Sequence, residues 1–98
     1  MNQLFAVIVS EAESWDPSKP IEGQRDFTAH FDYMKSLNSA GFLVLGGPLE
    51  DSPDRLMVVR AGSPEEIRQR LAADPWQRSK HLRVNRISPW TIALGNLA

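Results

Sequence analysis

The stretch GFLVLGGPLEDSPDRLMVVRA, residues 41–61, decides the fold of this chain. It contains two apolar runs, residues 42–45 and 55–61, and the turn formers at 53–54 precede the second run. The first run is predicted to end at the two glycines and the proline at 46–48, because these residue types interrupt regular elements. Short apolar runs separated by turn residues are typical of a hairpin. We therefore predict two adjacent antiparallel strands in the middle of the chain.

A helix with clear boundaries follows the hairpin. Ser63 is the predicted N-cap, Pro64 occupies the first helical position, and Glu66 completes a capping box. Asp74 precedes Pro75, and a residue before proline disfavours helical geometry. This helix is therefore predicted to end at Asp74.

Another helix and two outer strands complete the pattern. Residues 24–40 are predicted to be helical, and Gly41 is suited to end that helix. The apolar run at 4–9 and the segment at 81–87 are predicted to be the first and last strands, and Ser-Pro-Trp at 88–90 interrupts the last one. The order β-α-β-β-α-β predicts an α+β protein of ferredoxin-like fold, in which two helices cover one face of an antiparallel sheet.

The first strand indicates an assembly of two chains. Every position of its run at 4–9 is apolar, which is typical of a strand covered on both faces. The 98 residues are expected to form a single domain, 1–98, and leave no third layer to cover the second face. We therefore expect a homodimer, with residues 91–94 adding apolar surface near the interface.

The composition argues against several classes of protein. Eleven Lys and Arg balance 12 Asp and Glu, so no excess of positive charge indicates a nucleic-acid partner. Cysteine is absent, which excludes a disulfide framework, a thiol nucleophile and a thiolate metal site. No apolar run approaches the roughly 20 residues that span a bilayer, and the N-terminus lacks the basic region of a signal peptide. We expect a cytoplasmic protein that binds neither nucleic acid nor membrane.

His30 is the first candidate for chemistry. It shares a helical stripe with Phe27, Met34 and Leu37, so its imidazole is expected to face the core, where it needs a polar partner. Asp74 is the predicted partner, and a histidine held by a carboxylate is a common acid–base pair. The alternative is a structural histidine, bonded to that aspartate or to a backbone carbonyl.

Asp74 and Arg25 each have two interpretations. Aspartate before proline is a standard turn former, and a catalytic role requires its side chain to turn inward toward His30. Arg25 lies little more than one turn before His30 on the predicted helix. It could bind a substrate carboxylate with both ends of its guanidinium, or it could be a solvated residue of the first turn.

The remaining candidates lie in the hairpin and after the second helix. Gly46, Gly47 and Pro48 could bring backbone N–H groups close to an anionic ligand, or they could allow tight packing at a strand end. The stretch lacks the other features of a phosphate-binding loop, so we exclude nucleotide binding. Trp76, directly after the Asp-Pro pair, is the first choice as an aromatic pocket wall, with a core or interface role as the alternative.

The sequence predicts no metal and no cofactor. His81 begins the last strand among charged residues and is predicted to be exposed. Two histidines far apart, without paired carboxylates, form no metal-binding motif. The serines and threonines lack the glycine-flanked turn of a nucleophilic serine.

The ordered set of motifs resembles the YciI-like, or YCII-related, family. The resemblance spans nearly the whole chain and rests on the opening strand, Arg25 five residues before His30, and the segments at 41–49, 63–66, 74–76 and 87–90. It implies a ferredoxin-like fold that dimerises into an α+β barrel, with a His–Asp centre at His30 and Asp74. Related barrels include muconolactone isomerase-like enzymes, and at least one YciI-like member is linked to dehydrochlorination of a chlorinated hydroxyquinol. The loop at 15–23 is longer than expected for the family and is predicted to reshape the pocket mouth.

These inferences favour a small, homodimeric, cytoplasmic enzyme that needs no cofactor. His30 and Asp74 would move a proton on a small carbonyl or enol metabolite, by isomerisation or by elimination of HX, as an isomerase or a lyase does. The expected substrate-binding residues are Arg25, Gly46, Gly47, Pro48 and Trp76. The alternative is a non-catalytic dimeric module that binds a small metabolite or a partner protein, in which His30 and Asp74 form a structural bridge.

Overall fold

The computed structural model describes residues 2–95, and its elements follow the predicted order. Two short helical turns, η1 and α3, are additions that the sequence patterns did not predict. The elements are β1 (Gln3–Glu11), the 3-10 turn η1 (Ile21–Gly23), α1 (Phe27–Ser39), β2 (Leu43–Pro48), β3 (Asp54–Ala61), α2 (Pro64–Ala72), α3 (Pro75–Arg78) and β4 (Leu82–Pro89).

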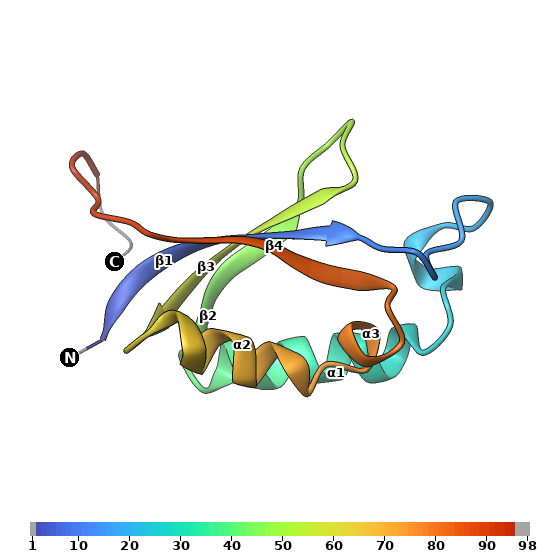
Figure 1. Cartoon of the computed structure of the whole chain (residues 1–98), viewed down its shortest axis with the longest axis horizontal. Coiled ribbons are helices and arrows are strands. Elements are labelled where there is room, and N and C mark those ends of the chain that lie inside the picture. The colour runs from blue at the N-terminus through green and yellow to red at the C-terminus, as the bar shows by residue number, and fades with distance from the viewer. Residues whose placement is uncertain (1, 96–98) are drawn as a thin grey trace.

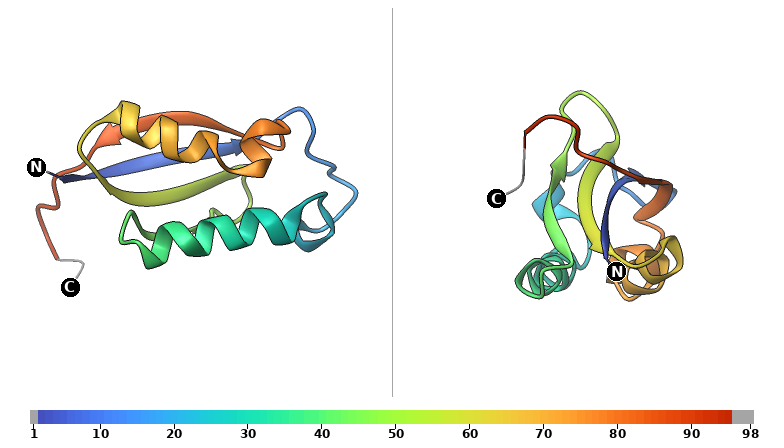
Figure 2. Two further views of the ribbon diagram at one scale, coloured as in Figure 1. Left: turned by 90° about the horizontal axis from the view of Figure 1, so that it is seen from below. Right: turned by 90° about the vertical axis from the view of Figure 1, so that its left-hand side faces the viewer.

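The strands form one antiparallel sheet in the order β2-β3-β1-β4. The helices all lie on one face of this sheet (Figure 1). Figure 2 shows α1 and α2 on the same side of the sheet, set apart from each other. This is the ferredoxin-like α+β fold, so the predicted fold class and the predicted β2-β3 hairpin are confirmed.

The side chains of β1 point alternately to a face of the sheet that the helices cover and to a face that is open. Phe5, Val7 and Val9 belong to the core under the helices and are at most 2% exposed. The residues that alternate with them from 4 to 8 are only half-buried. Side chains alternate between the two faces of a strand, so the continuous apolar run conceals a difference in burial. Within residues 2–95, only the helix side of the sheet carries a second layer.

Two strands extend further than predicted. β2 continues through residues 46–48, which pair with residues 55–57 of β3. β4 continues to Pro89, opposite Phe5 of β1. Both are edge strands, where a proline can sit without breaking a ladder on both sides. Each strand therefore ends inside the segment predicted to end it, β2 at Pro48 and β4 at Pro89, and not before that segment.

Helix α2 begins at the predicted cap. The Ser63 hydroxyl accepts a hydrogen bond from the Glu66 N–H at 3.2 Å, and Pro64 is the first helical residue. The Glu66 carboxylate accepts the Gly62 N–H at 2.8 Å, one residue before the N-cap that a standard capping box would engage. Two backbone donors at the helix start are thus satisfied by side chains.

Asp74 starts a new helix just after α2 ends. Its backbone is extended, with φ −67° and ψ 128°, as a residue before proline prefers. Its carboxylate accepts the Trp76 N–H at 3.0 Å and so caps the four-residue helix α3. This short helix directs Trp76 into the core, where the indole is 0% exposed.

Helix α1 begins at Phe27, three residues later than predicted. Asp26 has a left-handed backbone, with φ 60°, which interrupts the helical path before Phe27. Gln24 instead stabilises the preceding loop. Its side-chain amide donates to the carbonyls of Asp16 and Lys19 at 2.7 and 3.2 Å, and it accepts the Asp16 N–H at 3.0 Å.

Candidate functional site

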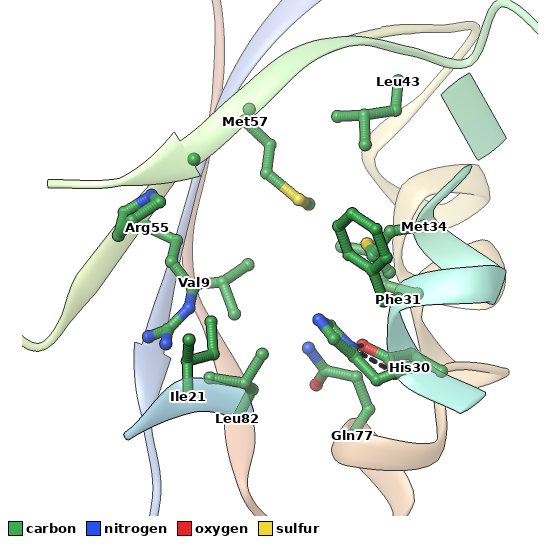
Figure 3. A pocket seen from close by; sticks show the side chains of 15 residues that line it. Val9, Ile21, His30, Phe31, Met34, Leu43, Arg55, Met57, Gln77 and Leu82 are labelled. Atoms are coloured by element: carbon green, nitrogen blue, oxygen red, sulfur yellow. Dashed lines mark hydrogen bonds and ion pairs between the residues drawn. The ribbon is translucent and has the colours of Figure 1, made fainter. Parts of the chain in front are cut away.

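A cavity of about 230 Å³ lies between the helices and the sheet. Most of the side chains that line it are apolar, and the polar ones are His30, Arg55, Asp74 and Gln77. Figure 3 shows Arg55 and Val9 on the strand side and His30 with Gln77 on the helix side. The cavity therefore combines an apolar body with a few polar groups, which is typical of small-molecule sites.

His30 and Asp74 form the hydrogen bond that the sequence predicts. Nδ1 of His30 lies 2.8 Å from Oδ1 and 3.0 Å from Oδ2 of Asp74. The two side chains are 10% and 1% exposed, respectively. Asp74 Oδ1 also accepts the Trp76 N–H, so the carboxylate position is fixed from two directions.

This hydrogen bond determines which nitrogen of His30 can act. A carboxylate only accepts hydrogen bonds, so Nδ1 carries the proton that is donated to Asp74. In the neutral ring, the lone pair then resides on Nε2. No hydrogen bond from Nε2 to another described residue accompanies the Asp74 contacts, and the ring lines the cavity. Nε2 is thus the ring atom left for a ligand.

Trp76 lies behind the imidazole and not on the cavity wall. Its ring stacks on that of His30, with 3.9 Å between centroids and 10° between planes. The indole is fully buried and does not line the cavity. The prediction that Trp76 is a pocket wall is therefore wrong, because α3 directs the indole beneath His30. It fixes the plane of the imidazole instead.

Arg25 also lies outside the cavity. Its side chain is exposed, and its backbone carbonyl accepts the Trp76 indole N–H at 2.5 Å. The left-handed Asp26 separates Arg25 from α1, so the helical spacing that placed it near His30 does not apply. The prediction that Arg25 binds substrate in this cavity is not supported by its position.

Gly46, Gly47 and Pro48 do line the cavity, from the edge strand β2. A Cβ atom on Gly46 would lie 3.3 Å from a Met57 side-chain carbon and 3.4 Å from one of Leu43. A Cβ on Gly47 would meet nothing within 4 Å. Close packing therefore accounts for Gly46, while Gly47 leaves space at the cavity edge.

Arg55 and Gln77 are cavity residues that the sequence reasoning missed. Arg55 starts the inward-facing series of β3 that continues with Met57 and Val59. This alternation was visible in the sequence, but a charged residue at a strand end is usually assigned to solvent. Gln77 comes from α3, which is too short to produce a periodic pattern.

The loop at residues 15–23 forms part of the cavity wall. Ile21 of η1 lines the cavity, and Trp15 packs edge-on against Trp76 with ring centroids 5.4 Å apart. The Ser18 side-chain and backbone hydrogen bonds to Asp16 lower the pKa of that carboxyl. The loop is thus an ordered element of the site.

His81 is buried, which corrects the prediction that it is exposed. It is 6% exposed, and its ring stacks on that of Trp76 at 5.9 Å between centroids. The His81 N–H donates to the Trp76 carbonyl at 2.9 Å, so the turn after α3 carries the imidazole inward. Its Nδ1 lies 2.7 Å from the Ser79 hydroxyl.

Two further observations limit the kinds of site that are present. Among residues 2–95, no three His, Cys, Asp or Glu side chains are placed to bind one metal ion. Every helix in that part of the chain is too short or too polar to cross a membrane.

Comparison with known proteins identifies a solved structure of similar fold. No family model matches the chain, and no curated protein matches it. The chain is similar to 5-chloro-2-hydroxyhydroquinone dehydrochlorinase (TftG) from Burkholderia phenoliruptrix AC1100, in complex with 2,5-dihydroxybenzoquinone. The TM-score is 0.66 at 18% identity, over 91% of this chain and 94% of that chain. At this identity, the likeness shows a shared fold.

Proposed function

We propose that this protein is a small enzyme of the YciI-like family, in which His30 is the general acid–base and Asp74 orients it. The observation that carries the proposal is the His30–Asp74 hydrogen bond of 2.8 Å at the wall of an otherwise apolar cavity. It leaves Nε2 as the proton acceptor. The stacked Trp76 ring holds the imidazole plane, so the base is oriented before a ligand arrives.

The proposed chemistry is proton transfer on a carbonyl or enol compound. Nε2 of His30 removes a proton from the carbon next to the carbonyl, and the C–H electron pair becomes part of an enolate. In an elimination, that pair forms a C=C bond as the C–X bond breaks and X leaves as an anion. In an isomerisation, the imidazolium returns the same proton to a different carbon. Neither route needs an oxidant, a reductant or a cofactor.

The size of the cavity limits the substrate. A cavity of about 150 Å³ can hold benzene. The larger cavity in this protein, about 230 Å³, therefore fits one six-membered ring with a few substituents. TftG is named for a chlorinated hydroxyhydroquinone, and its structure contains 2,5-dihydroxybenzoquinone. We accordingly propose a ring-sized carbonyl or enol as substrate, with Gly47 and Pro48 at the cavity edge next to it.

We also propose that the protein is a cytoplasmic homodimer in which two open sheet faces meet. Leu45 is 46% exposed and pairs with Val58 in the register that places both on the open face. Among the other apolar residues of that face, Leu4, Ala6, Ile8 and Leu56 are half-buried and Val58 is already 2% exposed in the single chain. A dimer of this kind should bury more than roughly 1,200 Å² in total.

Light scattering after size exclusion tests the dimer. We expect the mass of two chains at micromolar concentration, and a shift toward one chain for Leu45→Glu, which places a charge on the exposed apolar part of the proposed interface. A single-chain mass for the unmodified protein would exclude the homodimer. The catalytic proposal does not depend on this result, because the described cavity is lined by one chain.

The alternative is a non-catalytic module that binds a small metabolite. One observation favours it: the same Asp74 carboxylate that holds His30 also caps α3, so the pair supports the local fold. A structural bridge and a catalytic centre share this geometry. They differ in what happens when a ligand occupies the cavity.

A substrate screen with two histidine variants separates the two functions. The probes are 5-chloro-2-hydroxyhydroquinone and a set of cyclic enones and 3-halo ketones, which carry the halogen on the carbon adjacent to the one that loses its proton. Turnover is monitored by halide release and absorbance. The variant His30→Gln keeps an N–H donor for the buried carboxylate, and His81→Gln is the matched control. We expect turnover that falls about 100-fold or more in His30→Gln and persists in His81→Gln. Binding without turnover, or equal losses in both variants, would favour the module.

A further inference from the structure

We propose that Arg55 binds an anionic oxygen group of the ligand in the cavity that His30 lines. This inference rests on the proposed function, because it takes the cavity as the ligand site, and it narrows the ligand to a ring-sized anion. Arg55 lies opposite Val9 of β1 and Pro48 of β2, and both of these residues line the same cavity. Among the described lining residues, it is the one with a guanidinium or ammonium group.

The burial of Arg55 calls for a strong partner. Its side chain is 12% exposed, and a guanidinium that is removed from water is costly unless it is paired and hydrogen-bonded. Its carboxylate partner, Glu11, lies 3.6 Å away through Nη1, which is longer than a hydrogen bond. The Pro53 carbonyl accepts from the same Nη1 at 3.5 Å, at the limit of a hydrogen bond.

No other described residue engages the remaining donors of Arg55, which leaves them for a ligand. A guanidinium has five N–H donors, and both described contacts of Arg55 use Nη1. The Trp15 ring lies under the guanidinium carbon at 4.7 Å and restricts the plane of the group without using a donor. A planar group with free N–H bonds, held in place, is suited to bind an oxyanion with two hydrogen bonds.

The opposite wall adds no second guanidinium or ammonium group among the described lining residues. The other charged group at the cavity is the Asp74 carboxylate, which repels anions and is already engaged by His30. The strand-side neighbours of Arg55 in Figure 3, Val9, Ile21 and Leu82, are apolar. A ligand that presents an anionic oxygen to Arg55 and a carbon acid to His30 would use both polar ends of the cavity.

Glu11 provides a second test, in which the expected change in anion affinity is opposite to that in the Arg55 variants. Its side chain is 30% exposed, so it can return to water when a ligand anion takes its place at Arg55. Removing the Glu11 charge should therefore strengthen anion binding, whereas removing the Arg55 charge should weaken it. A purely structural Arg55–Glu11 pair would give no such opposition.

The experiment compares benzoate with benzamide, two ligands of the same shape that differ in charge. Dissociation constants are measured by NMR titration for the unmodified protein and for Arg55→Gln, Arg55→Lys and Glu11→Gln, with Arg25→Gln as the exposed-arginine control. We expect benzoate to shift the signals of cavity residues and to bind about tenfold more tightly than benzamide. Arg55→Gln should abolish that preference, Arg55→Lys should retain part of it, and Glu11→Gln should increase it.

Three results for the unmodified protein and the arginine variants would overturn the inference. These are a benzoate preference that survives Arg55→Gln, an equal loss in Arg25→Gln, and an absence of saturable benzoate shifts at cavity residues. If Arg55→Gln does not fold, Glu11→Gln still decides, because weaker or unchanged benzoate binding in that variant contradicts the proposal. The outcome is independent of catalysis: loss of turnover in His30→Gln with an unchanged benzoate preference in Arg55→Gln would retain the enzyme and remove the anion site.

Discussion

His30 and His81 form a matched pair within one molecule. Their residues are 8% and 6% exposed, and both rings stack on the indole of Trp76. They differ in partner: Nδ1 of His30 faces the Asp74 carboxylate, whereas Nδ1 of His81 faces the Ser79 hydroxyl. They also differ in surroundings, because His30 lines the apolar cavity and His81 does not. Burial and aromatic stacking are therefore common to both and cannot by themselves define a catalytic histidine.

The partner is what distinguishes the two imidazoles chemically. A carboxylate can only accept, so it assigns the Nδ1 proton of His30 and leaves Nε2 as the base. A hydroxyl can donate or accept, so Ser79 assigns no tautomer to His81. The comparison predicts that perturbations of the shared tryptophan affect both rings, while perturbations of the partners affect one ring each.

The largest effect is expected from Trp76→Ala, which removes what the two histidines share. Loss of a fully buried indole should lower the free energy of unfolding by about 3–5 kcal/mol, because buried contacts are lost and a cavity remains. Both imidazoles should lose their fixed orientation. Denaturant unfolding and the NMR signals of the two rings check this. A loss below about 1 kcal/mol, or a change in the NMR signals of one histidine only, would show that Trp76 does not hold both imidazoles in place.

Asp74→Asn should change the tautomer of His30 and leave that of His81 unchanged. The amide N–H can donate to Nδ1, which moves the ring proton to Nε2 and removes the base from the cavity. We expect the Nε2–H tautomer in long-range ¹H–¹⁵N spectra, no tautomer change at His81, and activity lower by at least about tenfold. Retention of the Nδ1 proton together with full activity would contradict the assigned role of the carboxylate.

The overall fold was predictable because its signals are local. The apolar runs set the strands, and Ser63-Pro64 set the start of α2. The inward orientation of His30 was predictable for a related reason, because the helical stripe turns it toward the core. Its pairing with Asp74, 44 residues further along the chain, was supported by the resemblance to the YciI-like family and by no local pattern.

The rest of the site depends on short or tertiary features. Helix α3 has four residues, so it produces no periodicity, yet it decides where Trp76 and Gln77 lie. The burial of His81 follows from its contact with Trp76, which no local pattern encodes. Arg55 faces the cavity because of its strand register, against the usual preference of arginine for solvent.

The smallest effect is expected from Ser79→Ala, which removes the hydrogen-bond partner of His81. Removing one hydrogen bond to His81 should cost about 0.5–1.5 kcal/mol of unfolding free energy. Turnover should not change, because neither residue lines the cavity. Denaturant unfolding and the activity assay measure the two quantities in the same preparation. A loss of turnover comparable with that of Asp74→Asn would remove the distinction between the two histidines.

Solvent deuterium exchange into a cyclic ketone tests the central claim most directly, because it detects proton abstraction whatever the complete reaction is. Cyclohexanone and cyclohexane-1,2-dione are incubated in D₂O with the unmodified protein, His30→Gln and His81→Gln, and exchange at the carbon next to the carbonyl is followed by NMR. The unmodified protein and His81→Gln should accelerate exchange, and His30→Gln should lower that rate about 100-fold or more. Exchange that is equal in the two variants would contradict the role of His30 as the base.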